Sequence, residues 1–208
     1  KELIDFLSQG SNILLIKGNP GTGKTILSLE LLNYFQKDIN GIYTSTRISS
    51  KRLFAQFPWL EDVVKPEHVL EVPRKGIVVS DAKMKKYPTS FEHIYDLAMS
   101  TKNPMIVVDS WEAATEELVG ERMGVIRLLE TLISSKNASI ILVSEMPDQT
   151  TLDYLVDGVV ELSMKTIDGR RAREIEFTKL RGIKVDRPKY FFTLLDGRFM
   201  CFKETKPQ

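Results

Sequence analysis

Cysteine is nearly absent from this sequence of 208 residues. The single cysteine, Cys201, cannot form an internal disulfide, and its apolar neighbours favour a core thiol over a nucleophile. A chain without disulfides suits a reducing compartment. Long hydrophobic runs are also lacking: none approaches the roughly 18 apolar residues that a transmembrane helix needs, and no signal peptide is recognisable. We therefore expect a cytoplasmic protein without a membrane partner.

Histidine and net charge are scarce as well. His68 and His93 have no ligand-like spacing with each other or with Cys201, which argues against a metal site made of these residue types. The formal net charge of +1 gives no electrostatic argument for binding nucleic acid or acidic lipid. With 42% hydrophobic and 27% charged residues, the composition is that of a globular protein, and we expect a single domain over residues 1–208.

The most informative segment is GNPGTGKT at residues 18–25, which fits the phosphate-binding pattern G-x-x-x-x-G-K-[ST] at every required position. Its glycines allow a tight turn with inward-pointing backbone N–H groups, and the following helix adds its positive end. In such a loop Lys24 reaches the β- and γ-phosphates, and the Thr25 hydroxyl ligates Mg²⁺. The predicted ligand is ATP with Mg²⁺, held by Gly18, Asn19, Pro20, Gly21, Thr22, Gly23, Lys24 and Thr25.

The neighbouring sequence separates this loop from a chance glycine-rich turn without a ligand. Residues 12–17 form an apolar run typical of a buried strand, and residues 26–35 have the apolar content of a helix. Farther along, the apolar run 105–109 ends in Asp109, which is the form of a Walker B strand whose aspartate holds Mg²⁺ through water. Ser110 follows, so no glutamate adjoins Asp109 to act as a base.

Strands and helices alternate over the first two-thirds of the chain. Further strands are predicted at 41–45 and 139–143, and helices near 50–57, 90–101 and 111–135, whereas prolines make residues 58–90 irregular. The alternation predicts an α/β fold with a mainly parallel sheet flanked by helices. In the last third, Asp-Gly pairs at 168–169 and 196–197 separate extended runs at 158–165, 171–180, 190–195 and 198–202. They predict two C-terminal antiparallel hairpins.

Taken in this order, these parts resemble the RecA-like P-loop NTPases, in particular the single-domain relatives of the clock protein KaiC. The resemblance is carried by residues 18–25, 105–110 and 141–145, and by the C-terminal pair 157–162 and 179–182. Within that family, residues 45–49 followed by 56–60 are similar to the P-loop domain of the gas-vesicle regulator GvpD.

The resemblance implies further roles. Ser144 or Glu145, at the end of the strand after Walker B, would sense the γ-phosphate. Lys179 and Arg181 match a Lys-x-Arg-Gly stretch that reaches into a neighbouring subunit's site, and residues two apart on a strand point the same way, so both cations could face one phosphate. That role implies a homo-oligomer such as a hexameric ring. The alternative is that both cations form ordinary surface ion pairs.

One position departs from the family pattern. The family places a catalytic glutamate at the end of the second strand, where this chain has Thr46, Arg47, Ile48 and Ser49. A guanidinium stays protonated and cannot act as a base, and loss of a general base costs typically about 10²–10⁴-fold in rate. Glu112 and Glu145 are possible substitutes away from the usual position. Arg47 could instead pair with a phosphate or an acid and hold the site in a bound state.

Three functions remain open on this sequence. The favoured one is an ATP–Mg²⁺-binding regulatory protein with slow or switch-like hydrolysis, acting on an unidentified protein partner. The second is an active DNA-associated ATPase, with the basic clusters 83–86 and 170–173 lining the pore of a ring, although both clusters also fit solvated turns. The third is an interaction domain whose phosphate loop is a relic.

Overall fold

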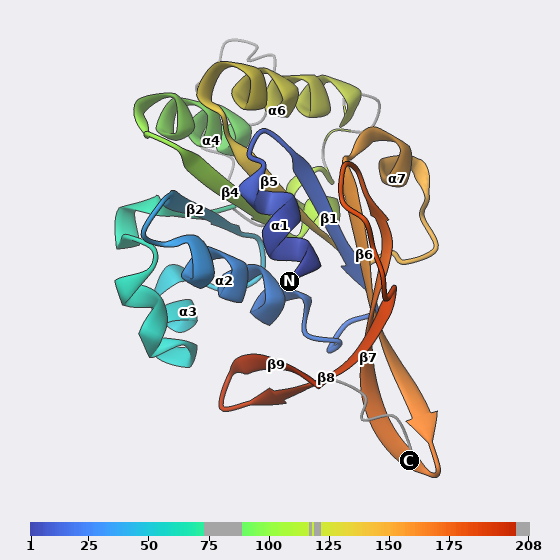
Figure 1. Ribbon diagram of the computed structural model, residues 1–208. Coiled ribbons are helices and arrows are strands. Elements are labelled where there is room, and N and C mark those ends of the chain that lie inside the picture. Colours follow the sequence, from blue (N-terminus) through green and yellow to red (C-terminus); the bar gives the residue numbers. More distant parts are fainter. Residues whose placement is uncertain (73–88, 117, 119–121, 203–208) are drawn as a thin grey trace.

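The computed structural model describes residues 1–72, 89–116, 118 and 122–202. In this part of the chain, nine strands form one sheet in the order β3-β2-β4-β5-β1-β6-β7-β8-β9 (Figure 1). The strands are β1 Ile13–Gly18, β2 Asn40–Ser45, β3 Val69–Glu71, β4 Pro104–Asp109, β5 Ser139–Ser144, β6 Gly158–Ile167, β7 Arg170–Leu180, β8 Lys189–Leu195 and β9 Arg198–Phe202. Neighbours from β3 to β6 pair in parallel and those from β6 to β9 pair antiparallel. The predicted α/β fold with C-terminal hairpins is confirmed.

Helices cover both faces of the parallel part. The helical segments are α1 Glu2–Ser8, α2 Lys24–Phe35, α3 Ser50–Gln56, η1 Pro58–Asp62, η2 Pro66–His68, α4 Thr89–Ser100, α5 Trp111–Ala114, α6 Arg122–Lys136 and α7 Thr151–Leu155. Leu14 and Ile16 of β1 pack in one core with α1, α2 and α3, whereas Ile13 and Leu15 face α4 and α6 on the other side. Because both faces are covered, the apolar run that predicted this strand is continuous rather than alternating.

The structure differs from the sequence expectation in three respects. The helical pattern at 111–135 is not one helix: α5 ends at Ala114 and α6 begins at Arg122. Short α1, α7 and β3 were not predicted, since each is too brief to give a periodic signal. Cys201 is exposed rather than in the core, because it lies on β9 at the edge of the sheet. Of the two basic clusters, residues 83–86 lie outside the described residues.

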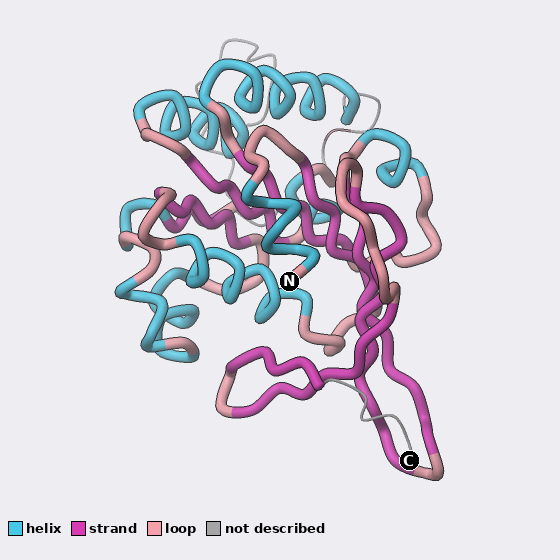
Figure 2. The backbone as a smooth tube through the Cα atoms, viewed as in Figure 1, coloured by secondary structure: helices cyan, strands magenta, loops and turns pink. Residues whose placement is uncertain are grey.

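The two hairpins extend in different directions. The β6–β7 hairpin projects away from the body, whereas β8–β9 turns back beside α2, as Figure 2 also shows. No helix in the described ranges is long and apolar enough to cross a bilayer.

The carboxyl ends of the parallel strands meet at one edge of the sheet, and this positions the site. Asp109 at the end of β4 is in register with Ser45 of β2 on one side and Val143 of β5 on the other. Lys17, one residue before the end of β1, is in register with Ser144. Segments that are distant in sequence therefore emerge next to the loop between β1 and α2.

Candidate functional site

The loop between β1 and α2 depends on close backbone packing. A Cβ on Gly18 would lie 2.2 Å from the backbone oxygen of Leu162 on β6, so only glycine fits there. Gly23 caps α2 in a left-handed conformation with φ of 105°, which glycine adopts without steric cost. The close approach at Gly18 and the left-handed conformation of Gly23 set the path of the loop and the direction of the first turn of α2. The free N–H groups of that turn form an anion site.

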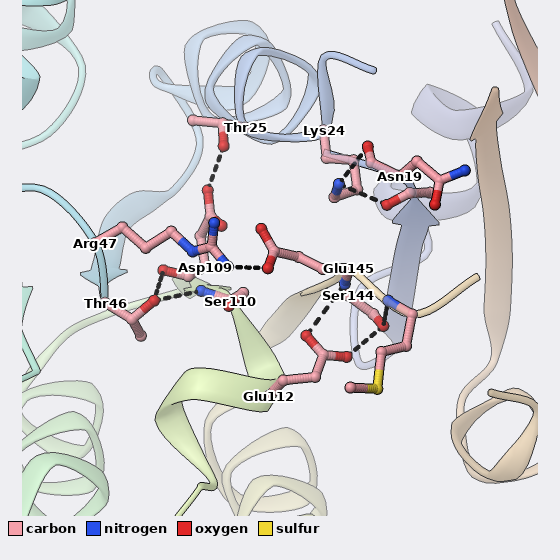
Figure 3. Close-up of polar contacts among 12 residues, drawn as sticks. Asn19, Lys24, Thr25, Thr46, Arg47, Asp109, Ser110, Glu112, Ser144 and Glu145 are labelled. Carbon is pink, nitrogen blue, oxygen red and sulfur yellow. Dashed lines mark hydrogen bonds and ion pairs between the residues drawn. The ribbon is translucent and has the colours of Figure 1, made fainter. Parts of the chain in front are cut away.

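Lys24, the first residue of α2, lies folded over the loop. Its Nζ donates to the backbone oxygens of Gly18 at 2.6 Å and Asn19 at 2.9 Å (Figure 3). Burial lowers the pKa of Lys24, and the nearby carboxylates of Glu145 and Asp109 partly oppose that shift. The ammonium group therefore has only weak carbonyl partners inside a poorly hydrated site, where a phosphate would be a stronger one.

Thr25 and Asp109, the two residues predicted to hold Mg²⁺, are brought together. The Thr25 hydroxyl donates to Asp109 Oδ2 at 2.6 Å. The phenol of Tyr43 on β2 donates to the same oxygen at 2.7 Å. Burial, together with the Asp109 charge, raises the pKa of Tyr43 well above its usual value. Sequence reasoning missed Tyr43 because an aromatic residue in a buried strand is usually a packing residue.

Arg47 and Glu145 form an ion pair across the site. The segment that carries Arg47 is held by Thr46, whose hydroxyl donates to the Asp109 backbone oxygen at 3.0 Å and accepts from the Ser110 N–H at 2.9 Å. Figure 3 shows the guanidinium of Arg47 pointing toward the carboxylate of Glu145. The position at which the family keeps its glutamate thus holds a cation, and that cation is paired with the acid at the end of β5.

Glu112, the other possible substitute base, has a different role in this arrangement. Its carboxylate accepts from the Ser144 hydroxyl and from the Glu145 backbone N–H, the latter at 3.1 Å. Ser144, expected to sense the γ-phosphate, therefore donates its hydroxyl hydrogen to Glu112. Glu112 fixes the end of β5 and is itself occupied by two donors.

A cavity of about 350 Å³ lies beside the loop. Its polar end includes Lys24, Thr25, Asp109, Arg47 and Glu145. Its other wall is largely apolar and combines residues from three places in the sequence: Ile26 of α2, Ile48 and Phe57 around α3, and Leu194 of β8. No local pattern could have placed Leu194 here, because only the folding back of β8–β9 brings it against the loop at Gly23.

The β8–β9 hairpin is held against α2 by an ion pair and against η1 by a cation–π contact. Arg198 forms an ion pair with Glu30 of α2, including an Nη2–Oε2 hydrogen bond of 2.9 Å. The Arg198 guanidinium also lies 4.8 Å from the ring centroid of Trp59, within the range of a cation–π contact. These contacts hold Leu194 at the apolar wall of the cavity.

Lys179 and Arg181 lie away from this cavity. Lys179 Nζ donates to the backbone oxygens of Asp153 at 2.9 Å and Val156 at 2.5 Å, and Arg181 pairs with Asp157 at 2.8 Å. Burial, followed by the charge of Arg181, lowers the pKa of Lys179. Both cations thus contact residues of their own chain. Their action on a neighbouring subunit remains a prediction.

No group of three or more histidine, cysteine, aspartate or glutamate side chains in the described ranges is arranged to hold a metal ion. Mg²⁺ does not require such a group, since it usually binds through one or two protein oxygens, waters and the phosphates of its nucleotide. The Thr25 hydroxyl and the Asp109 carboxylate, side by side at the end of the loop, fit that donor set.

Comparison with known proteins agrees with this geometry. The family described as the GvpD gas vesicle protein, P-loop domain, matches residues 4–178. The protein GvpD1 of Halobacterium salinarum is 30% identical over 206 residues, covering 93% of this chain and 38% of the relative. GvpD2 of the same organism is 26% identical, covering 93% and 42%. The chain thus spans only about two-fifths of the length of these two relatives.

Other relatives are of similar size to this chain. A UPF0273 protein of Thermotoga maritima is 25% identical, and the match covers 92% of this chain and 87% of the relative. Among solved structures, a KaiC-like protein from Pyrococcus horikoshii OT3 has a TM-score of 0.70 at 18% identity, covering 93% and 90% of the two chains. That likeness shows the KaiC-like fold. The chain belongs to the family of the GvpD P-loop domain and is a RecA-like, KaiC-like P-loop protein.

Proposed function

We propose that this chain binds ATP with Mg²⁺ and works as a nucleotide-operated regulatory switch that hydrolyses ATP slowly. The observation that carries the proposal is the Arg47–Glu145 ion pair facing the phosphate loop across one cavity. The loop supports binding, and the ion pair supports slow turnover.

Binding is supported by the two ends of the cavity. Its polar end offers the loop and the Lys24 ammonium to phosphates, and its apolar wall of Ile48, Phe57 and Leu194 suits a nucleobase. Its volume of about 350 Å³ is within the range of small-molecule sites. Thr25 and Asp109 would hold Mg²⁺, the latter through water, and the ion would neutralise charge on the β- and γ-phosphates when bound.

Slow hydrolysis is supported by the contacts of the three residues considered as sites of a general base: Arg47, Glu145 and Glu112. Arg47 cannot accept a proton from water. Glu145 is paired with Arg47, and Glu112 accepts from Ser144 and from the backbone of Glu145. Loss of a general base lowers turnover by about 10²–10⁴-fold. A long-lived bound state is what a switch needs, and Arg47 could signal it by exchanging Glu145 for the γ-phosphate.

The DNA-associated alternative receives less support. The cluster 170–173 lies at the projecting end of β6–β7, where Arg173 is partly buried and acidic Glu174 follows it and pairs with Lys165 and Lys189. Assembly into a ring, with Lys179 and Arg181 acting in trans, and control of a protein partner remain parts of the proposal, because one chain contains neither neighbour.

Thermal unfolding with millimolar ATP and Mg²⁺ tests the proposal. A ligand at about 100 times its dissociation constant stabilises the folded state by about 2.7 kcal/mol, which raises the Tm of a chain of this size by roughly 5–10 °C. Lys24→Ala, which lacks the phosphate-binding ammonium, should show no rise. If the wild-type Tm does not respond to ATP with Mg²⁺, the loop is a relic and the proposal is wrong.

A further inference from the structure

Tyr43 has a contact that packing alone does not require. Its ring is 2% exposed within β2, and its hydroxyl lies 2.7 Å from Asp109 Oδ2 on the adjacent strand β4. In the parallel register Tyr43 is opposite Val107, so the phenol reaches along the sheet toward the carboxyl end of β4. It ends at the carboxylate that also receives the Thr25 hydroxyl.

Both hydrogen bonds act on one oxygen of Asp109. Oδ2 accepts from Thr25 at 2.6 Å and from Tyr43 at 2.7 Å, on a side chain that lines the cavity. Two donors on the same oxygen fix the rotation of a carboxylate more firmly than one donor can. They also use the lone pairs of Oδ2, which leaves Oδ1 as the oxygen able to accept from a metal-bound water.

We propose that Tyr43 is a positioning residue for the Mg²⁺ site: its phenol holds the Asp109 carboxylate in the rotation that binds the hydrated ion. This inference rests on the proposed function, because it needs ATP with Mg²⁺ as the ligand. Partners that orient a metal-binding carboxylate typically change metal affinity by about 10–100-fold when they are removed. Tyr43 also lines the cavity, but its hydroxyl is directed at Asp109, so we expect it to act through that carboxylate.

The test compares Tyr43→Phe with Tyr190→Phe. Phenylalanine keeps the ring and removes the hydroxyl in both variants. Tyr190 is the matched control, since its hydroxyl donates to the carboxylate of Glu2 at 2.6 Å, but its side chain does not line the cavity. Mg²⁺ is titrated at fixed ATP, with thermal stabilisation as the readout, and ATP binding is also measured in EDTA. Tyr43→Leu provides a second variant without the phenol.

We expect Tyr43→Phe to need about tenfold more Mg²⁺ for half-maximal stabilisation, with ATP binding in EDTA unchanged. Tyr190→Phe should keep the wild-type midpoint. An unchanged midpoint for Tyr43→Phe, or an equal loss of ATP binding in EDTA, would overturn the inference while leaving the proposed function standing. Absence of any wild-type response to ATP with Mg²⁺ would instead remove the proposed function.

Discussion

Arg47 at the end of β2 is paired with Glu145 at the end of β5, across the strand that carries Asp109. The pair links the residue that replaces the family's glutamate to the acid best placed to substitute for it. The Arg47 guanidinium donates to Glu145 Oε2 and so occupies that oxygen as a hydrogen-bond acceptor. Arg47 therefore replaces the family's base at the end of β2, and through this ion pair it also restrains Glu145 at the end of β5.

Removal of the Arg47 guanidinium should release Glu145. We expect Arg47→Ala to raise ATP turnover about tenfold, since a freed but imperfectly placed carboxylate recovers only part of the 10²–10⁴-fold that a general base supplies. Steady-state phosphate release measures this. Arg52→Ala removes an exposed arginine of α3 and serves as the control. The gain should vanish in Arg47→Ala/Glu145→Gln; a rate that stays flat or falls in Arg47→Ala argues against restraint by the ion pair.

The burial of Lys24 makes stability without nucleotide depend on pH. Because the pKa of Lys24 is lower in the folded chain than in the unfolded one, the unfolded state binds the proton more tightly. The charged side chain therefore destabilises the fold at neutral pH, and this penalty is relieved as pH rises through the folded pKa toward its usual value of 10.5. Relative to Lys24→Met, the wild type should gain Tm between pH 7 and 10.

The control for this pH dependence is Lys51→Met, which removes an exposed lysine of α3. Its Tm difference from the wild type should change little over the same interval. If the difference between Lys24→Met and the wild type has no slope with pH, or slopes in the opposite direction, then burial does not lower the pKa of Lys24.

Two loop glycines should tolerate alanine very differently. A Cβ at Gly18 meets the Leu162 backbone oxygen at 2.2 Å, whereas a Cβ at Gly21 meets no atom within 4 Å. Gly21→Ala should cost about 1–2 kcal/mol for its φ of 81° alone, and Gly18→Ala about 3 kcal/mol or more, because β1 and β6 must move apart. Urea unfolding gives both free energies. Equal costs would mean that the close approach to β6 does not constrain the loop.

The β8–β9 hairpin should affect the nucleoside end of the ligand and not its phosphates. Arg198→Ala removes the contacts to Glu30 and Trp59 that hold Leu194 at the cavity wall. We expect it to weaken ATP binding several-fold and to leave binding of inorganic tripolyphosphate unchanged, as measured by calorimetry. Lys189→Ala, on β8 of the same hairpin, removes an exposed ion pair with Glu176 of β7 and should change neither. A parallel loss for both ligands would indicate a general disturbance of the loop.

The fold was largely predictable because its signals are local. Three kinds of signal predicted it: the loop motif, the apolar run ending in Asp109 and the Asp-Gly turns of the hairpins. The residues that make up each signal are close together in the sequence. The division of the 111–135 pattern into α5 and α6 was not visible, since apolar side chains recur across the interruption. Exposure of Cys201 was also missed, because composition does not show that β9 is an edge strand.

The candidate site was predictable in its residue types but not in its partners. Sequence identified Arg47 as a departure from the family pattern and Glu145 as a possible substitute base, yet their pairing depends on the order of β2, β4 and β5 in the sheet. Tyr43 and Leu194 were missed for the same reason: each reaches the site from a segment whose own pattern indicates only a strand. Contacts between distant segments decide the chemistry here, and no periodicity encodes them.

Single-turnover hydrolysis by the wild-type chain tests the proposed slow hydrolysis of ATP most directly. Protein in excess is mixed with radiolabelled ATP and Mg²⁺ and quenched over time, with Lys24→Ala as the blank. Bound nucleotide should remain ATP, with a rate of about 0.1 s⁻¹ or less, at least about 100-fold below the median enzyme turnover near 10 s⁻¹. A rate near 10 s⁻¹ that Glu145→Gln abolishes would show that Glu145 is a working base despite Arg47, and it would contradict the switch.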